Sequence, residues 1–145
     1  MNLTEHFTFA EVIRSDEAAE LQVSNALPEA MMGNARIAAE GMERVRELLG
    51  HPVEVTSWYR CPQVNDAVGG AKESAHIEAF AVDFVCPAFG TPKQIVFEIV
   101  RSGIRFDKCI EEGRWVHISF DPRLRQQLMT AHFDHGFATY TKGLS

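Results

Sequence analysis

Hydrophobic spacing in the first third of the chain predicts one long amphipathic helix preceded by shorter helical segments. From Pro28 onward, apolar residues recur at alternating intervals of four and three, which is the period of one helix face. These residues are Met31, Ala35, Ala38, Met42, Val45 and Leu49. Gly50 stands where a helix C-cap is expected, and Pro52 follows it. Earlier in the chain, residues 8–11 form a capping-box pattern and residues 15–21 predict a further helical turn.

Three later segments have the alternation and composition of β-strands. Residues 52–59 and residues 80–85 are rich in β-branched and aromatic side chains. Residues 105–120 predict a β-hairpin that turns near Glu112 and Gly113.

Two more helices are predicted from their start signals. Thr91 and Gln94 form a capping box around a proline at the first helical position. Residues 121–133 predict a last helix, with Asp121 as its cap and Pro122 in its first turn. Because strands and helices do not alternate regularly, the pattern indicates a single α+β domain spanning the whole chain, with a mainly antiparallel central sheet flanked by helices.

Charge and composition exclude several classes of protein. The apolar fraction is 46% and the charged fraction 23%, as in ordinary globular proteins. Fourteen Lys and Arg against 20 Asp and Glu give a net charge of -6 without any basic cluster, which argues against a nucleic-acid partner. No apolar run reaches the roughly 20 residues of a membrane helix, and residues 1–20 lack a secretory-signal pattern. We therefore expect a cytoplasmic product without membrane insertion.

The three cysteines are expected to be small core residues. Cys61, Cys86 and Cys109 are odd in number, widely spaced and form no C-x-x-C pair. A disulfide framework and a zinc-finger site are both excluded by this spacing.

Asp83 carries the clearest chemical signal, because it lies inside an apolar strand. An unpaired buried carboxylate is costly, so a cation, a set of donors or a metal ion is expected beside it. On the second strand of the predicted hairpin, Trp115 and His117 share the face opposite the all-apolar one. If the two strands are neighbours, Asp83 and His117 meet on one surface, and His76 in the preceding loop can join them.

Two imidazoles and one carboxylate would supply three ligands of a catalytic zinc ion and leave a fourth position for water. Zinc lowers the pKa of bound water to about 7, which makes a nucleophile available at neutral pH. An alternative without metal is that Asp83 caps a turn or pairs with Arg60, and that the histidines are incidental.

Two motifs resemble those of a known family. The segment SAHIEAFAVDF (residues 74–84) is similar to the S-x-H-x-x-G-x-A-x-D signature of the zinc D-Ala-D-Ala carboxypeptidase/endopeptidase superfamily, whose fold is shared with the hedgehog signalling domain. The segment WVHISF (residues 115–120) is similar to its W-x-H strand, and the closing YTKGL resembles the short phage-type branch. By this resemblance His76, Asp83 and His117 would hold one zinc ion per chain.

The same resemblance implies roles for residues near the metal ligands. Glu112 would be the general base, with Glu111 as the neighbouring alternative. Arg60 would face the scissile carbonyl or a substrate carboxylate. Ser74 would hold the substrate or orient the neighbouring ligand histidine, and Trp115 would contact the substrate.

The implied activity is hydrolysis of peptidoglycan stem peptides, either at a D-Ala-D-Ala terminus or at an internal L-Ala-D-Glu-type bond. Such a monomeric enzyme, made in the bacterial cytoplasm without a signal peptide, would act on the cell wall after release, like an endolysin, or as part of a virion. The alternative is a non-catalytic binding or structural module with a closed zinc site. Its fourth ligand would be His51, His132 or His135, although residues 131–135 are expected to form a surface patch at a helix end.

The sequence departs from the family pattern near the proposed site. Ala79 and Phe80 stand where the family prefers glycine followed by a polar residue, and Trp58 stands where it usually has glycine. We expect these changes to add bulk near the cleft. If the backbone at Ala79 has a positive φ, the alanine would cost on the order of 1 kcal/mol.

Overall fold

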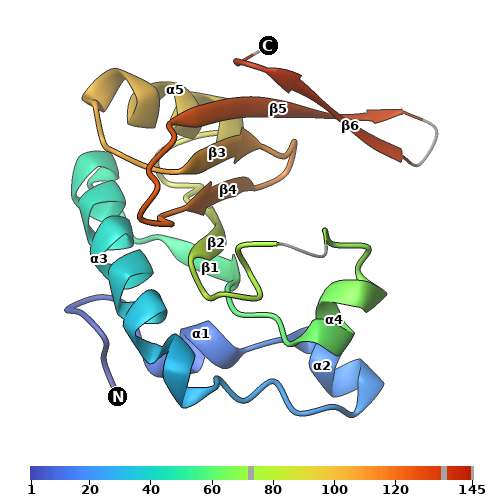
Figure 1. Cartoon of the computed structure of the whole chain (residues 1–145). Helices are drawn as coiled ribbons and strands as arrows, with labels where there is room; N and C mark the ends of the chain where they lie inside the picture. Colours follow the sequence, from blue (N-terminus) through green and yellow to red (C-terminus); the bar gives the residue numbers. More distant parts are fainter. Residues whose placement is uncertain (72–73, 135–136, 145) are drawn as a thin grey trace.

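The computed structural model describes residues 1–71, 74–134 and 137–144 (Figure 1). Its helices, in chain order, are α1 (Phe9–Ile13), α2 (Asp16–Leu21), the 3₁₀ helix η1 (Glu29–Met31), α3 (Met32–Leu49), α4 (Pro62–Ala67) and α5 (Pro92–Ser102). Its strands are β1 (Glu54–Ser57), β2 (Ala81–Val85), β3 (Lys108–Glu111), β4 (Val116–Ser119), β5 (Gln127–Asp134) and β6 (Phe137–Lys142).

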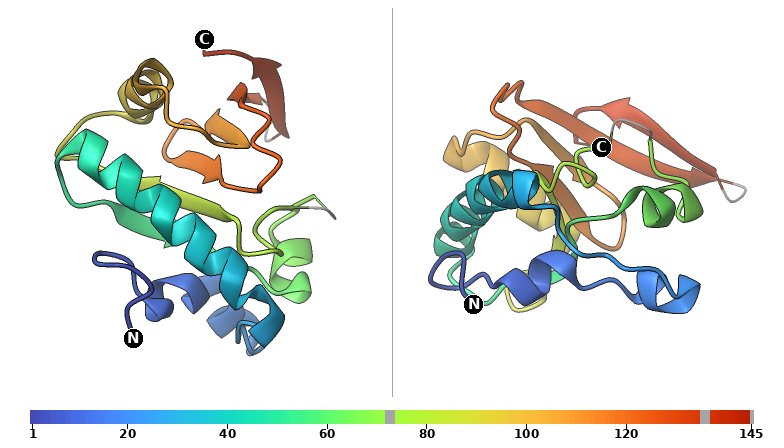
Figure 2. Two further views of the ribbon diagram at one scale, coloured as in Figure 1. Left: turned by 60° about the vertical axis from the view of Figure 1, so that its left-hand side comes forward. Right: turned by 60° about the horizontal axis from the view of Figure 1, so that its bottom comes forward.

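The six strands form one sheet in the order β1-β2-β4-β3-β5-β6. Every neighbouring pair is antiparallel except β3 and β5, which run parallel. Helices α3 and α5 lie on one side of this sheet (Figure 2), where their buried faces pack against the apolar faces of the central strands. The α+β class with a mainly antiparallel central sheet is therefore confirmed. None of the helices in the described ranges is long and apolar enough to cross a membrane.

Helix α3 buries the face that its apolar spacing predicts. Its buried residues include Ala35, Ala38, Met42, Val45 and Leu49, whereas Met31 is only partly buried. The helix ends at Gly50, which has a φ of 69° and is left-handed as a C-cap requires. The predicted start is slightly early, because the first turn after Pro28 is the 3₁₀ helix η1.

Local signals also fix the ends of the shorter helices. Thr8 caps α1 and Thr91 caps α5, each in a capping box closed by the side chain three residues later. The prediction for the cysteines is confirmed as well, because all three are free and buried.

The predicted helix over residues 121–133 is wrong, because this segment forms a turn and then strand β5. Asp121 does cap a backbone N–H, but that of Arg123 at 2.9 Å, which closes a turn instead of opening a helix. Leu124 and Gln126 then have positive φ values, 43° and 56°, which no α-helix contains. The chain continues as β5 because it pairs with the edge of β3, an interaction that local sequence does not reveal.

A glycine in α3 makes room for an aromatic side chain of the core. A Cβ atom built on Gly41 would lie 2.5 Å from the ring of Phe120, which is 2% exposed. At Gly33, in the same helix, a Cβ atom would meet nothing within 4 Å.

We predict that Gly41→Ala lowers the free energy of unfolding by about 1–3 kcal/mol, because overpacking outweighs the gain in helix propensity. Gly33→Ala is the matched control, and it should raise stability by up to about 1 kcal/mol. Urea denaturation of both variants tests this, and a Gly41→Ala variant as stable as Gly33→Ala would contradict it.

Candidate metal centre

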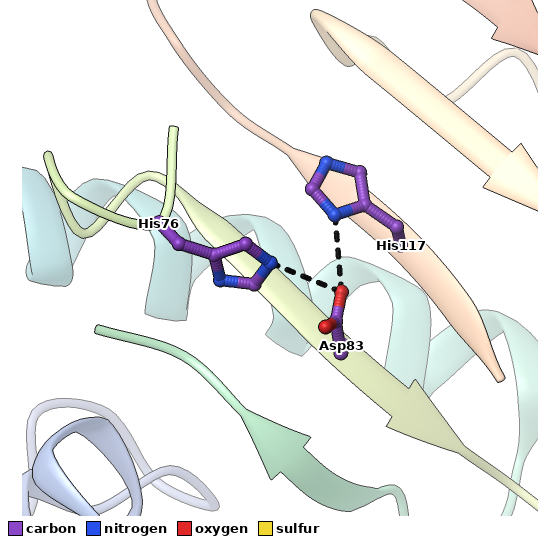
Figure 3. Close-up of side chains that lie close together, drawn as sticks. All are labelled: His76, Asp83 and His117. Atoms are coloured by element: carbon purple, nitrogen blue, oxygen red, sulfur yellow. Dashed lines mark hydrogen bonds and ion pairs between the residues drawn. The ribbon is translucent and has the colours of Figure 1, made fainter. Parts of the chain in front are cut away.

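Strand pairing brings together the three residues predicted to bind metal. Asp83 on β2 is directly opposite His117 on β4. One carboxylate oxygen of Asp83, Oδ1, lies 3.0 Å from Nδ1 of His117 and 3.2 Å from Nε2 of His76 (Figure 3). His76 reaches this point from the loop that precedes β2. The ligand atoms of all three side chains lie within 4.8 Å of one another.

These distances suit a small tetrahedral metal ion. Ligand atoms at about 2.0–2.1 Å from a tetrahedral zinc ion are separated by about 3.3 Å, close to the two observed spacings. The other ring nitrogen of His76, Nδ1, lies 2.6 Å from the carbonyl oxygen of Trp58. Because a carbonyl oxygen only accepts, Nδ1 donates a proton to it. The proton that must leave when a metal binds is therefore the one on Nε2, whose lone pair then faces the site.

Asp83 is held in its ionised form, as a metal ligand must be. The residue is 4% exposed. Burial opposes ionisation, but the charges of His76 and His117 and their hydrogen bonds outweigh it and lower the pKa of the Asp83 carboxyl below its usual range. The donor set therefore fits a divalent cation.

Arg60 contacts the second oxygen of Asp83. Its Nη2 lies 3.2 Å from Oδ2, so the two carboxylate oxygens have separate partners. The ion pair with Arg60, which belongs to the alternative without metal, is thus present, but it leaves Oδ1 directed at both imidazoles. Ion pairing with Arg60 and metal binding are compatible in this geometry.

The backbone around Arg60 is fixed on both sides. Its own N–H donates to the carbonyl of His76 at 3.1 Å. The preceding N–H, that of Tyr59, donates to Val12, and the following one, that of Cys61, donates to the buried side chain of Asn25. This network anchors the guanidinium beside the candidate metal centre.

The two glutamates of the hairpin turn have different environments. Glu112 is 8% exposed and lines the same cleft as His117. Burial raises the pKa of its carboxyl above the ordinary value. Glu111 instead accepts a hydrogen bond from the backbone N–H of Gly113 within the turn. The geometry thus favours Glu112 over Glu111 as the acid of the site.

The candidate centre opens into a cleft of about 850 Å³, which also contains the predicted substrate-binding residues Ser74, Arg60 and Trp115. Ser74 additionally accepts a hydrogen bond from the backbone N–H of His76 at 3.2 Å, so it helps to orient that loop. The β5–β6 hairpin supplies a further part of the lining. Its side chains Met129, Phe133 and Tyr140 were not predicted.

The departures from the family pattern change the core and leave the cleft unaltered. Ala79 has a φ of 65°, so the condition for a strained, left-handed backbone at this alanine is met. Trp58 is fully buried, and its Nε1 donates to the carbonyl of Ala79 at 2.9 Å. Phe80 is 7% exposed. None of these three residues lines the cleft, so the expectation of added bulk there is wrong.

No fourth side chain closes the metal site within the described ranges, where His76, Asp83 and His117 form the one candidate metal group. His51 is exposed, and His132 lies on β5 with Nε2 at 2.9 Å from the hydroxyl of Thr141. The expected patch at a helix end is wrong, since residues 131–134 belong to a strand. His135, the remaining alternative, lies outside the described residues.

We predict that zinc binds the purified chain stoichiometrically, and that His117→Ala weakens binding by more than about 100-fold through loss of a ligand. Isothermal titration calorimetry measures both values. His132→Ala is the control and should bind zinc like the unmodified chain. Equal zinc affinity in His117→Ala and the unmodified chain would contradict this prediction.

We predict that Ala79→Gly raises the free energy of unfolding by about 1 kcal/mol, because glycine adopts a positive φ without strain. Ala19→Gly, on the exposed face of α2, should instead lower it by about 1 kcal/mol. Urea denaturation distinguishes the two. A loss of stability in Ala79→Gly would show that the left-handed backbone there is not strained.

Comparison with known proteins agrees with this site. The family model described as Peptidase M15 matches residues 5–119, a range that includes all three candidate metal ligands as well as Arg60 and Glu112. A comparison with curated proteins finds no match. The matched family comprises zinc peptidases of the D-Ala-D-Ala carboxypeptidase/endopeptidase type. From the length of this match, the chain belongs to the Peptidase M15 family.

Proposed function

We propose that this chain is a zinc-dependent peptidase that hydrolyses peptidoglycan stem peptides in the bacterial cell wall. One observation carries the proposal: the two histidines and Asp83 share a cleft with a buried glutamate and a fixed arginine. A purely structural zinc site would be closed by a fourth protein ligand, and the described residues supply none.

The zinc ion would be held by Nε2 of His76, Oδ1 of Asp83 and Nδ1 of His117. When bound, it would supply a Lewis acid and lower the pKa of water to about 7. The fixed Nδ1 proton of His76 and the ionised state of Asp83 prepare both side chains for this role.

Glu112 would act as the general base and then as the general acid. Its carboxylate is buried, and within the described ranges it has no hydrogen-bond partner of its own. It is therefore free to accept a proton from the attacking water and to return it to the leaving amine.

Arg60 would have two tasks. Through Nη2 it positions Asp83, and its remaining N–H groups can face the oxyanion that develops on the scissile carbonyl. Ser74 and Trp115, which line the same cleft, would contact the peptide on either side. The substrate would be cleaved either at a D-Ala-D-Ala terminus or at an internal L-Ala-D-Glu-type bond, by an enzyme released to the wall or carried by a virion.

We predict that Glu112→Gln lowers kcat on purified peptidoglycan by at least about 100-fold while zinc binding is retained. Glu111→Gln is the matched control, one residue away, and should keep nearly full activity. Chromatography of the released peptides measures activity, and calorimetry measures zinc binding.

The pH profile follows from the burial of Glu112. The pKa of its carboxyl is raised above the roughly 4.3 of an ordinary glutamate. As the pH falls through this raised pKa, the base becomes protonated and activity is lost.

An active Glu112→Gln variant would exclude its role as the base. A zinc-loaded protein that leaves every wall peptide intact would exclude the proposed function.

A further inference from the structure

The two ends of the cleft differ in charge, and strand register shows why. The side chains of Lys108 and Ile110 on β3, and of Glu112 directly after this strand, follow one another on the cleft side. Ile110 is opposite His117, and Lys108 is opposite Ser119. Lys108 is therefore two residues, about 6.8 Å along the strand, from the level of the metal centre, at the end remote from Glu112.

The end with Lys108 is cationic. Lys108 is half-buried and lines the cleft together with Arg123 and Arg125. Arg125 is held by Asp107, with Nε and Nη2 at 2.9 and 2.8 Å from the two carboxylate oxygens. Arg123 is held in the same way by Asp121, at 3.1 and 2.9 Å.

Among the charges at this end of the cleft, the ammonium of Lys108 remains without a counter-charge once the two Arg–Asp pairs are formed. The carboxylates of Asp107 and Asp121 are already neutralised by their arginines. Lys108 has no carboxylate within ion-pair distance among the residues that the structure describes. A half-buried ammonium without a carboxylate partner can form a charge-assisted hydrogen bond with an anion that enters the cleft.

The opposite end of the cleft is aromatic. Phe133 and Tyr140 are 55% and 47% exposed and line the cleft with Trp115, on the side of Glu112. Since Tyr140 is paired with Ala131 on β5, it lies toward the Glu112 end of the sheet. A peptide lying along the strands would thus have an apolar end and an anionic end.

We infer that Lys108, flanked by the fixed guanidinium of Arg125, binds a carboxylate of the substrate within about two residues of the scissile bond. This inference rests on the proposed function and adds a specificity-determining residue to it. Two carboxylates of a stem peptide fit: the free α-carboxylate of its γ-linked D-glutamate, and the C-terminal carboxylate of D-Ala-D-Ala. The arginine neighbours follow residue 119, where the family match ends.

Three synthetic stem peptides test the inference: the parent pentapeptide, its D-isoglutamine analogue and its C-terminal amide. Their affinities are measured by calorimetry with zinc-loaded Glu112→Gln protein, in which the peptides stay intact. Amidation of the recognised carboxylate should weaken binding about tenfold, as expected for loss of a hydrogen-bonded ion pair. The analogue that loses affinity identifies the carboxylate.

In the Glu112→Gln protein, the additional substitution Lys108→Gln should abolish the difference in affinity between the acid and its amide. The additional substitution Lys108→Arg should preserve this difference. Lys93→Gln is the matched control, because Lys93 is exposed on α5 and does not line this cleft. If the Lys108→Gln variant does not fold, a second measurement uses the protein that retains Lys108. The difference in its affinity for the acid and the amide must decrease at high NaCl concentration.

Equal binding of all three peptides, or no binding, overturns the inference, and so does a Lys108→Gln variant that keeps the preference. Failure of the proposed function gives a different result. In that case, protein with the native Glu112 cleaves none of the peptides. The difference in affinity between acid and amide nevertheless remains and still depends on Lys108.

Discussion

The carboxylate of Asp83 is the buried charge around which the cleft is organised. A strand interior stabilises such a group only if each oxygen has partners, and the fold supplies them from three parts of the chain. The pairing of β2 with β4 places His117 opposite it, the loop before β2 returns His76 to it, and the segment after β1 brings Arg60. Removing any one of these contacts would leave charge uncompensated in a dry environment.

The loops around Asp83 are held by hydrogen bonds to backbone carbonyl groups. The carbonyl of Trp58 orients the imidazole of His76, while the carbonyl of His76 receives the N–H of Arg60. The two loops therefore fix each other, and the indole of Trp58 adds a further bond to the chain just before β2. Preorganisation of this kind lets the ligands keep their orientation without a metal ion to hold them.

Local patterns predicted those parts of the fold that depend on local physics. The buried face of α3, the two capping boxes and the opposed faces of β4 follow from side-chain period and from short-range hydrogen bonds. Alternation also indicated that Asp83 and His117 could meet if their strands are neighbours, because it places each residue on the face opposite the apolar one. The position of His76 in the loop before that strand added it to the set, and the motif resemblance then supplied the roles of Arg60 and Glu112.

What the sequence did not reveal depends on distant contacts. A cap residue followed by proline begins helices and turns alike, so Asp121 gave no warning that the chain would extend as a strand along β3. With β5 taken for a helix, the aromatic wall formed by Phe133 and Tyr140 could not be foreseen. The bulk of Trp58 was likewise assigned to the cleft, because nothing in the local sequence distinguishes a core indole from a cleft one.

The parallel pairing of β3 with β5 has a consequence for the divergence of this peptidase. All the candidate metal ligands precede residue 120, whereas the hairpin that faces them is added afterwards at the margin of the sheet. The candidate metal ligands and the aromatic wall formed by Phe133 and Tyr140 therefore come from separate stretches of the chain. Substitutions in the last stretch can change this wall while the candidate metal ligands are retained.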